Sequence, residues 1–307
     1  MTFTPPALAG RGAPRLATLA VLIAALSFGT TGTVLVNAPE AADAWSVGAV
    51  RLLVGAATLL AVAARGGHRW IRPWRMRSTL LGALGVAGFQ AGYFLAVERT
   101  GVAVGTVVTI GSGPMVAGVI AAVRDRRPPA GPWLGGTAVS VVGVALLGLS
   151  GRSSAADAVG VLLAFGAGCG WALFATVGKT QIEQGSDSTA TMAAMFGGGA
   201  LLLSPVLLAH DPGWMEQGNG WWIGLYLGVV TVGAAYTLYG FALRHLPTHT
   251  VVTLTLLEPI TAAVLGAVLV HEGIHAAGWV GVALVVVGLW ATARDVTVEE
   301  ATGRTVA

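Results

Sequence analysis

The chain has 307 residues, of which 55% are hydrophobic and only 10% are charged. A soluble domain carries about 25% charged residues, so this composition excludes an ordinary soluble protein and indicates a membrane protein. The net charge of +3 does not indicate nucleic acid binding, because the basic residues lie in short segments between apolar runs. A single cysteine, Cys169, excludes a disulfide framework and a thiolate metal centre, and we expect neither metal nor cofactor.

Apolar runs of roughly 17–23 residues recur along the chain, and each is long enough to cross a bilayer about 30 Å thick. Arg11 and Arg15 precede the first run, as basic residues do in a signal peptide, but its apolar part is longer than such peptides have. We therefore expect this run to stay in the membrane. The ten expected transmembrane helices span residues 16–37, 46–64, 79–97, 102–123, 132–150, 158–178, 190–209, 221–243, 248–270 and 277–293.

The positions of Lys and Arg predict the orientation of these helices. Fourteen of them lie in alternate connections that start at the N-terminus, whereas only Arg99 and Arg152 lie on the opposite side. Because cytoplasmic connections carry the excess of basic residues, we expect both termini in the cytoplasm of a cell whose inner (plasma) membrane holds the protein. Eight tryptophans near the run ends are typical of an aromatic belt: Trp45, Trp70, Trp74, Trp133, Trp214, Trp221, Trp222 and Trp279.

The second half of the chain repeats the first, with residues 94–123 aligned on 239–269. Each half holds five apolar runs, an odd number, so the halves must insert in opposite senses. The predicted fold is an all-α membrane protein of ten transmembrane helices, arranged as two inverted five-helix repeats with a binding site between them at mid-membrane. The matching pairs include Arg99 with Arg244, Pro114 with Pro259, and Trp133 with Trp279.

The repeat also predicts the domain organisation. An N-terminal tail (1–15) precedes the first repeat (16–150), and the second repeat (151–294) precedes a C-terminal tail (295–307). The last helix of each repeat, 132–150 and 277–293, carries few polar side chains. We expect these two helices to face lipid or to form a homodimer.

Glu258-Pro259 lies near the middle of the run 248–270. A carboxylate at bilayer depth costs roughly 2.5–3.5 kcal/mol, so it normally faces protein or water. Proline lacks a backbone donor, so we expect a local break in this helix and, by the repeat, at Pro114 as well. Pro114 and Pro259 are predicted hinges rather than ligands.

Two charged residues inside the membrane are candidates for substrate binding. Glu258 shares a helical face with Thr255, and it could bind a substrate amine, carry a proton, or act only as a structural residue that pins the broken helix. Arg51 could hold a carboxylate or phosphate. Because Arg51 lies near a helix end, the favoured alternative is that it reaches the membrane surface or pairs with Glu40 or Asp43.

Aromatic and amide side chains on the third, sixth and eighth runs could form an amphipathic pocket, or they could be ordinary packing residues. Two threonines of the first run could line the same pocket, or bond to their own backbone. These candidates are Gln90, Tyr93, Trp171, Tyr236, Tyr239, Thr30 and Thr31.

The segment His271-Glu272-Gly273-Ile274-His275 matches the H-E-x-x-H pattern of zinc proteases. That chemistry needs an intact helix and a third ligand, and Gly273 in a short connection argues against such a helix. An intramembrane metalloprotease is kept as an alternative function, together with a non-transporting membrane scaffold.

In its order of motifs, the chain resembles the EamA-type members of the drug/metabolite transporter superfamily. The resemblance implies a carrier of small metabolites that is not an enzyme, often an exporter of amino acids, related metabolites or drugs, with alternating access between the repeats. Phe28 stands where these transporters usually have Trp, and Arg124-Asp125-Arg126-Arg127 stands where many have Gly-Glu, so the substrate is left open. The motifs are Ala25-Leu26-Ser27-Phe28-Gly29, Arg51, Pro114, Glu258-Pro259, Glu272 and Gly281…Gly288.

Overall fold

The structure is a computed structural model that describes residues 13–66, 76–126, 129–149, 157–269 and 275–302. All regular structure in these residues is helical. Nine of the described helical segments are long and apolar enough to cross a membrane, and a shorter apolar helix covers Gly131–Leu146. The all-helical membrane fold is therefore confirmed, whereas the number of ten spans stays a prediction.

The helices begin and end close to the expected positions. Three of them start after an aspartate whose side chain accepts backbone N–H groups, which is the usual N-cap: Asp43 for α2, Asp157 for α5 and Asp187 for α6. The helices are α1 (Ala13–Leu35), α2 (Ala44–Arg65), α3 (Met76–Asp125), α4 (Gly131–Leu149), α5 (Ala158–Glu183), α6 (Ser188–Leu203), η2 (Ser204–Leu208), η3 (Pro212–Glu216), α7 (Gly220–Gly228), η4 (Val229–Ala234), α8 (Ala235–His245), α9 (Thr248–Leu254), α10 (Leu257–Leu269) and α11 (Ala276–Thr302).

Helix α3 contains two of the expected spans, Met76–Gly101 and Val104–Arg124. They meet at a kink where Gly101 has φ 79° and ψ 162°. Residues other than glycine rarely adopt a positive φ of this kind, so glycine makes the tight connection without strain. The two spans follow each other with almost no loop.

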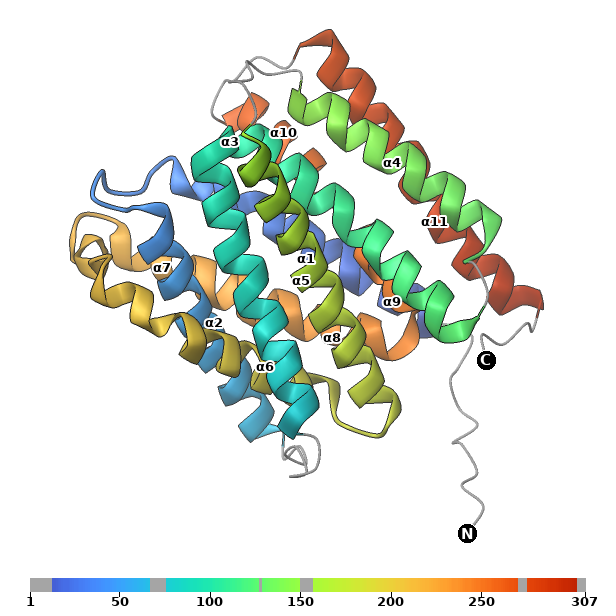
Figure 1. Cartoon of the computed structure of the whole chain (residues 1–307), viewed down its shortest axis with the longest axis horizontal. Helices are drawn as coiled ribbons and strands as arrows, with labels where there is room; N and C mark the ends of the chain where they lie inside the picture. The colour runs from blue at the N-terminus through green and yellow to red at the C-terminus, as the bar shows by residue number, and fades with distance from the viewer. Residues whose placement is uncertain (1–12, 67–75, 127–128, 150–156, 270–274, 303–307) are drawn as a thin grey trace.

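The first helix of each repeat packs on the other repeat. Helix α1 lies against α8 and α10, and α5 lies along α3 (Figure 1). Directly before the start of α5, the carboxylate of Asp157 pairs with Arg99 of α3 at 3.1 Å. This ion pair holds the pKa of Asp157 below its ordinary value. The two repeats are therefore interleaved rather than separate bodies.

The last helices of the two repeats, α4 and α11, run side by side at one edge of the molecule (Figure 1). Their backbones touch, because a Cβ added at Gly136 would lie 2.7 Å from the carbonyl oxygen of Gly288, and one at Gly143 would lie 2.6 Å from that of Gly281. Glycine permits this close approach of two helices. One face of α4 is thus packed against one face of α11. A homodimer through the outer faces of these two helices stays a prediction.

The surface of the helices is apolar, as contact with lipid requires. Trp221, Trp222 and Trp279 are at least half exposed, as expected of an aromatic belt. Trp133 and Trp214 are only 3% and 1% exposed, so the belt prediction is wrong for these two. Their indoles are covered by neighbouring helices instead of facing the membrane surface. Trp70 and Trp74 lie outside the described residues.

Candidate functional site

The helix predicted to break at Pro259 is interrupted one turn earlier in the chain. Helix α9 ends at Leu254 and α10 begins at Leu257. Pro259 has no N–H for the carbonyl of Thr255, which accepts the N–H of Glu258 at 2.9 Å instead. This tighter turn puts Glu258 in the first turn of α10, and the predicted break is confirmed.

No such break occurs at Pro114. Helix α3 continues through this proline, and its non-helical backbone lies at Gly101. The prediction of a break in both halves is therefore wrong. The physical reason is that a proline removes only one hydrogen bond of a membrane helix, and α3 is held along its length by α5. Gly113 lies directly on this contact, since a Cβ there would come within 2.6 Å of the Trp171 ring.

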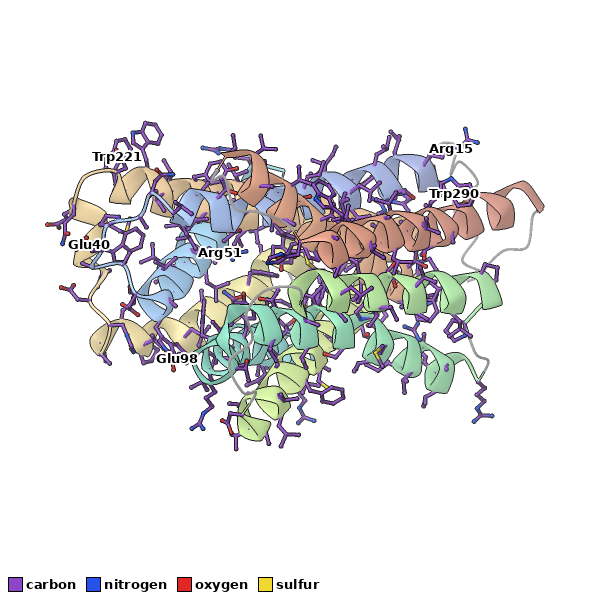
Figure 2. All side chains as sticks on the ribbon, turned by 90° about the horizontal axis from the view of Figure 1, so that it is seen from above. Arg15, Glu40, Arg51, Glu98, Trp221 and Trp290 are labelled. Atoms are coloured by element: carbon purple, nitrogen blue, oxygen red, sulfur yellow. The ribbon has the colours of Figure 1, made fainter. Side chains whose placement is uncertain are left out.

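Four of the chemically distinctive residues gather from four helices: Arg51 of α2, Tyr93 of α3, Tyr236 of α8 and Glu258 of α10. The charges of Arg51 and Glu258 both act on the two tyrosine hydroxyls, so all four groups lie within electrostatic reach of one another. Arg51 lies further in among the helices than Glu40, which is at the end of the molecule (Figure 2). The cluster draws on both repeats.

Arg51 does not pair with the acidic residues near its helix end. Among the described residues it makes no ion pair, and its Nε is buried without a hydrogen-bond partner. Asp43 binds His210 instead, with 2.9 Å between Oδ1 and Nδ1. The favoured alternative of pairing with Glu40 or Asp43 is thus not what the structure has.

Within the described part of the chain, Arg51 and Glu258 also make no ion pair with each other, although Arg51 lies close enough for its charge to act on Glu258. A partly buried charge without a direct partner is costly, and such groups usually bind a ligand or line water. A guanidinium binds carboxylates in a two-pronged geometry, and a carboxylate binds ammonium groups. The arrangement can therefore bind both ends of a zwitterion.

The other predicted aromatic residues form a cluster next to these charges. The ring of Tyr236 lies 5.1 Å from that of Phe28 and 4.1 Å from that of Phe196. Tyr239 is fully buried, and its hydroxyl lies near the Trp171 indole without making a hydrogen bond of good geometry. These tyrosines and Trp171 are thus packing residues at least in part.

The remaining candidates divide by what their polar atoms do. Tyr93 shares a hydrogen bond with Thr106 at 3.0 Å, and Gln90 is buried on the same helix. Thr255 lies in the break, and its hydroxyl donates to the carbonyl of Val252 in α9 at 2.7 Å, so it serves the break rather than a ligand.

The two threonines of α1 differ in the same way. The hydroxyl of Thr30 donates to the carbonyl of Ser27 at 2.7 Å and accepts from the hydroxyl of Tyr226 at 3.0 Å. The hydroxyl of Thr31 is buried and has no partner. Thr30 therefore joins α1 to α7.

One feature near the site was not predicted. Residues Val229–Ala234 form a π-helix directly before α8, which carries Tyr236. The widened turn lets Ser27 of α1 donate to the carbonyl of Val230 at 3.3 Å. Such turns are often found at functional sites. No sequence signal marks it beyond the nearby glycines, which are frequent throughout the chain.

Most of the H-E-x-x-H segment, residues 271–274, lies outside the described residues. In the part of the chain that the structure describes, no group of three or more His, Cys, Asp or Glu side chains could hold a metal ion. Two cavities of about 430 and 570 Å³ are lined by α3 with α5 and by α3 with α4, and neither lining includes a residue of the charged cluster. The candidate site is therefore the cluster between the repeats.

Comparison with known proteins agrees with this architecture. The model of the EamA-like transporter family matches the chain twice, over residues 15–149 and 158–294. The uncharacterized transporter YwfM of Bacillus subtilis is 36% identical over 88% of this chain and 91% of its own length. The threonine/homoserine exporter RhtA of Escherichia coli K12 is 28% identical over 78% of this chain and 76% of its own length.

The fold agrees as well. A solved crystal structure, 18% identical in sequence, superposes with a TM-score of 0.78 over 90% of this chain and 97% of its own length. The family model matches both halves of the chain, and the relative YwfM is named a transporter. The helical fold agrees with both findings. The chain belongs to the EamA-like transporter family of the drug/metabolite transporter superfamily.

Proposed function

We propose that this protein transports small zwitterionic amino acids out of the cell, with Arg51 binding the carboxylate and Glu258 binding the ammonium group. The observation that carries the proposal is an arginine and a glutamate from different repeats that lie within electrostatic reach and form no ion pair with any described residue. An amino acid would satisfy both charges at once, which offsets their cost in the membrane. The name of the relative RhtA, a threonine/homoserine exporter, supports this substrate class and direction.

Transport would proceed by alternating access. Because α1 packs on α8 and α10, and α5 packs along α3, we infer that each moving unit contains the first helix of the other repeat. The charged cluster takes residues from both units, so a bound amino acid would hold them together. The break between α9 and α10 gives Glu258 a short, movable support.

In vesicles, the proposed binding mode can be tested with analogues that lack one charge. Wild-type protein in liposomes should carry threonine or homoserine, but neither the N-acetyl derivative nor the carboxamide. Arg51→Gln should lose the preference for a free carboxylate, and Glu258→Gln the preference for a free amine. Arg99→Gln, which removes an exposed charge, is the matched control and should carry the amino acid normally.

Two results would overturn the binding mode. One is equal transport of the amino acid and both uncharged analogues by the wild type. The other is unchanged selectivity in Arg51→Gln and Glu258→Gln. A protein that folds but moves no solute would support the alternative of a non-transporting scaffold.

Glu258 is also the residue we assign to proton coupling, if transport uses a proton gradient. Replacing it with Gln should then abolish the dependence of flux on a pH gradient, while exchange of amino acid across the membrane continues. A facilitator would show no dependence on the gradient even in the wild type. The measurement is flux at equal and unequal pH across the liposome membrane.

We also propose that the protein lies in the cell inner (plasma) membrane and that both its termini are in the cytoplasm. The excess of Lys and Arg in alternate connections supports this orientation. A reporter enzyme that is active only in the cytoplasm should be active when it is fused to the C-terminus. Activity of a reporter that works only outside the cytoplasm, fused to the same end, would contradict this orientation.

A further inference from the structure

The contact that carries this inference joins the last helix of the first repeat to the broken helix of the second. Trp133 of α4 is only 3% exposed, and its indole N–H donates to the hydroxyl of Thr253 in α9 at 3.1 Å. Thr137, one turn further along α4, shares a hydrogen bond with the same hydroxyl at 3.1 Å. Two side chains of α4 therefore converge on one buried atom of α9.

Thr253 lies where α9 most needs support. This helix has only seven residues and ends at Leu254, immediately before the turn that leads to Glu258. A helix so short is not stable by itself, and the break deprives it of the hydrogen bonds that α10 would otherwise continue. Its position must come from contacts with other helices. The pair from Trp133 and Thr137 is such a contact, five residues from Glu258.

The indole of Trp133 is itself fixed on two sides. A Cβ added at Gly118 of α3 would come within 2.4 Å of its ring, so the ring lies directly on this glycine. The ring of His249, in the first turn of α9, meets it edge-on with 4.7 Å between centroids. Because the ring has little freedom to turn, its N–H stays directed at Thr253.

The repeat supplies a comparison within the same chain. Trp279 of α11 matches Trp133, but it is 52% exposed. The residue that matches Thr253 in the first repeat is Val108, which has no hydroxyl and lies in the uninterrupted part of α3. Among the described residues, the first repeat thus makes an indole–hydroxyl contact with the half that has the helix break and the carboxylate, and the matching pair Trp279 and Val108 makes none.

We propose that Trp133 is a positioning residue for the transport site, which holds α9 through Thr253 and thereby sets the place of Glu258. The proposal rests on the proposed function, because it assigns Trp133 an effect on amino acid binding. Its structural part, the hold on α9, does not depend on what the substrate is.

Two measurements on Trp133→Phe, Thr253→Val and the control Trp279→Phe test the proposal. The first is amide hydrogen exchange of the purified protein at residues 250–258, which needs no substrate. The second is the KM and the maximal rate of amino acid flux in liposomes. Trp133→Phe should speed exchange in this segment and raise KM about fivefold, the size expected for one lost hydrogen bond. Thr253→Val should have at least the same effects, since it also removes the hydrogen bond with Thr137.

The double variant should show little change beyond Thr253→Val, since that substitution already removes the hydrogen bond from Trp133. The maximal rate should stay within about twofold, and Trp279→Phe should leave both measurements as in the wild type. A purely structural tryptophan would instead lower the amount of folded protein with KM unchanged.

Three outcomes decide the matter. Unchanged exchange at residues 250–258 in both variants overturns the proposal, and so does faster exchange with an unchanged KM. Thr253→Val keeps the test open if Trp133→Phe does not fold, because it removes the contact without emptying the space over Gly118. If even the wild type carries no amino acid, the proposed function falls, and the exchange result alone then decides whether Trp133 holds α9.

Discussion

Gly113-Pro114 in α3 and Glu258-Pro259 in α10 occupy the same place in the two repeats, yet the helix is interrupted only at the second. Each pair packs on the first helix of the other repeat. Gly113 lies on the Trp171 ring of α5, and the carbonyl of Glu258 lies within 2.7 Å of a Cβ placed on Gly29 of α1. Both pairs thus pack against the first helix of the other repeat. The contacting groups differ, because a side-chain ring lies on Gly113 whereas a glycine lies on the backbone carbonyl of Glu258.

The difference teaches that proline alone does not break a membrane helix. In α3 the chain around Pro114 stays helical because one missing hydrogen bond costs less than the packing that a break would disturb. Before Pro259, the turn is supported locally by the hydrogen bond from Thr255 to Val252, and from outside by the hydrogen bond that Trp133 of α4 donates to Thr253. The second repeat therefore carries the charged group directly after a helix break, whereas the matching part of the first repeat is a continuous helix.

The largest effect is expected from substitutions that force apart the two close helix contacts, at Gly29 and at Gly113. Gly29→Leu and Gly113→Leu should each destabilise the protein by about 3 kcal/mol, since neither backbone can withdraw from its neighbour without moving a helix. Thermal unfolding in detergent and the yield of monodisperse protein measure the effect. Gly32→Leu, at a site with open space around it, is the control and should cost nothing. Normal stability of both buried variants would mean that these contacts are looser than described.

Replacing each proline with alanine compares the two halves directly. Pro259→Ala supplies the missing N–H and should let α9 and α10 join, which would lower flux about tenfold by fixing Glu258 in one place. Pro114→Ala adds a hydrogen bond to a helix that is already continuous, so its flux should stay near wild type and its melting temperature should rise. Flux in liposomes and thermal unfolding give the two readings. An equal loss of flux in both variants would contradict the asymmetry of the halves.

Hydropathy predicted most of the helices, because a membrane helix must be long and apolar whatever its neighbours are. The N-caps and the break at Pro259 also follow from local chemistry, which acts within a turn of the residue concerned. The exchange of α1 and α5 between the repeats does not, since it depends on which apolar faces fit together. Nor does the sequence distinguish Trp133 from Trp279, because the burial of an indole depends on a partner about 120 residues away.

The candidate site was predicted in its parts and not as a whole. Arg51 and Glu258 were each recognisable, since a charge inside a membrane span is rare. Their proximity was not, because the positions of α2 and α10 follow from how each packs on other helices. The π-helix before Tyr236 has no local signal either, so it could be found only from the backbone.

Tyr239 allows a comparison of the two repeats at a single hydroxyl group, because Phe94 stands at the matching position of the first repeat. The Tyr239 hydroxyl is buried without a hydrogen bond of good geometry. Tyr239→Phe should therefore raise the free energy of unfolding by up to about 1 kcal/mol and leave flux unchanged. Thermal unfolding and liposome flux check both expectations. A fall in flux at unchanged stability would instead make this hydroxyl part of the substrate path.

The smallest expected effect concerns the N-caps of the second helices, Asp43 of α2 and Asp187 of α6, which match in the two repeats. Burial raises the pKa of Asp43, but hydrogen bonds from Ser46 and Trp45 and the charge of His210 lower it below its ordinary value of 3.8. The charged form is thus favoured in the folded protein, so its contribution to stability is present above pH 3.8 and is lost as the pH falls through the folded pKa.

Asn at position 43 keeps a capping side chain and removes the charge. Because the aspartate is 41% exposed and screened by solvent, Asp43→Asn should cost only about 0.5 kcal/mol at pH 6. The difference from wild type should shrink between pH 5 and pH 3, as thermal unfolding over that range would show. His210→Gln should add nothing in the Asp43→Asn background. A difference that stays constant down to pH 3 would mean that the charge of Asp43 does not stabilise this end of α2.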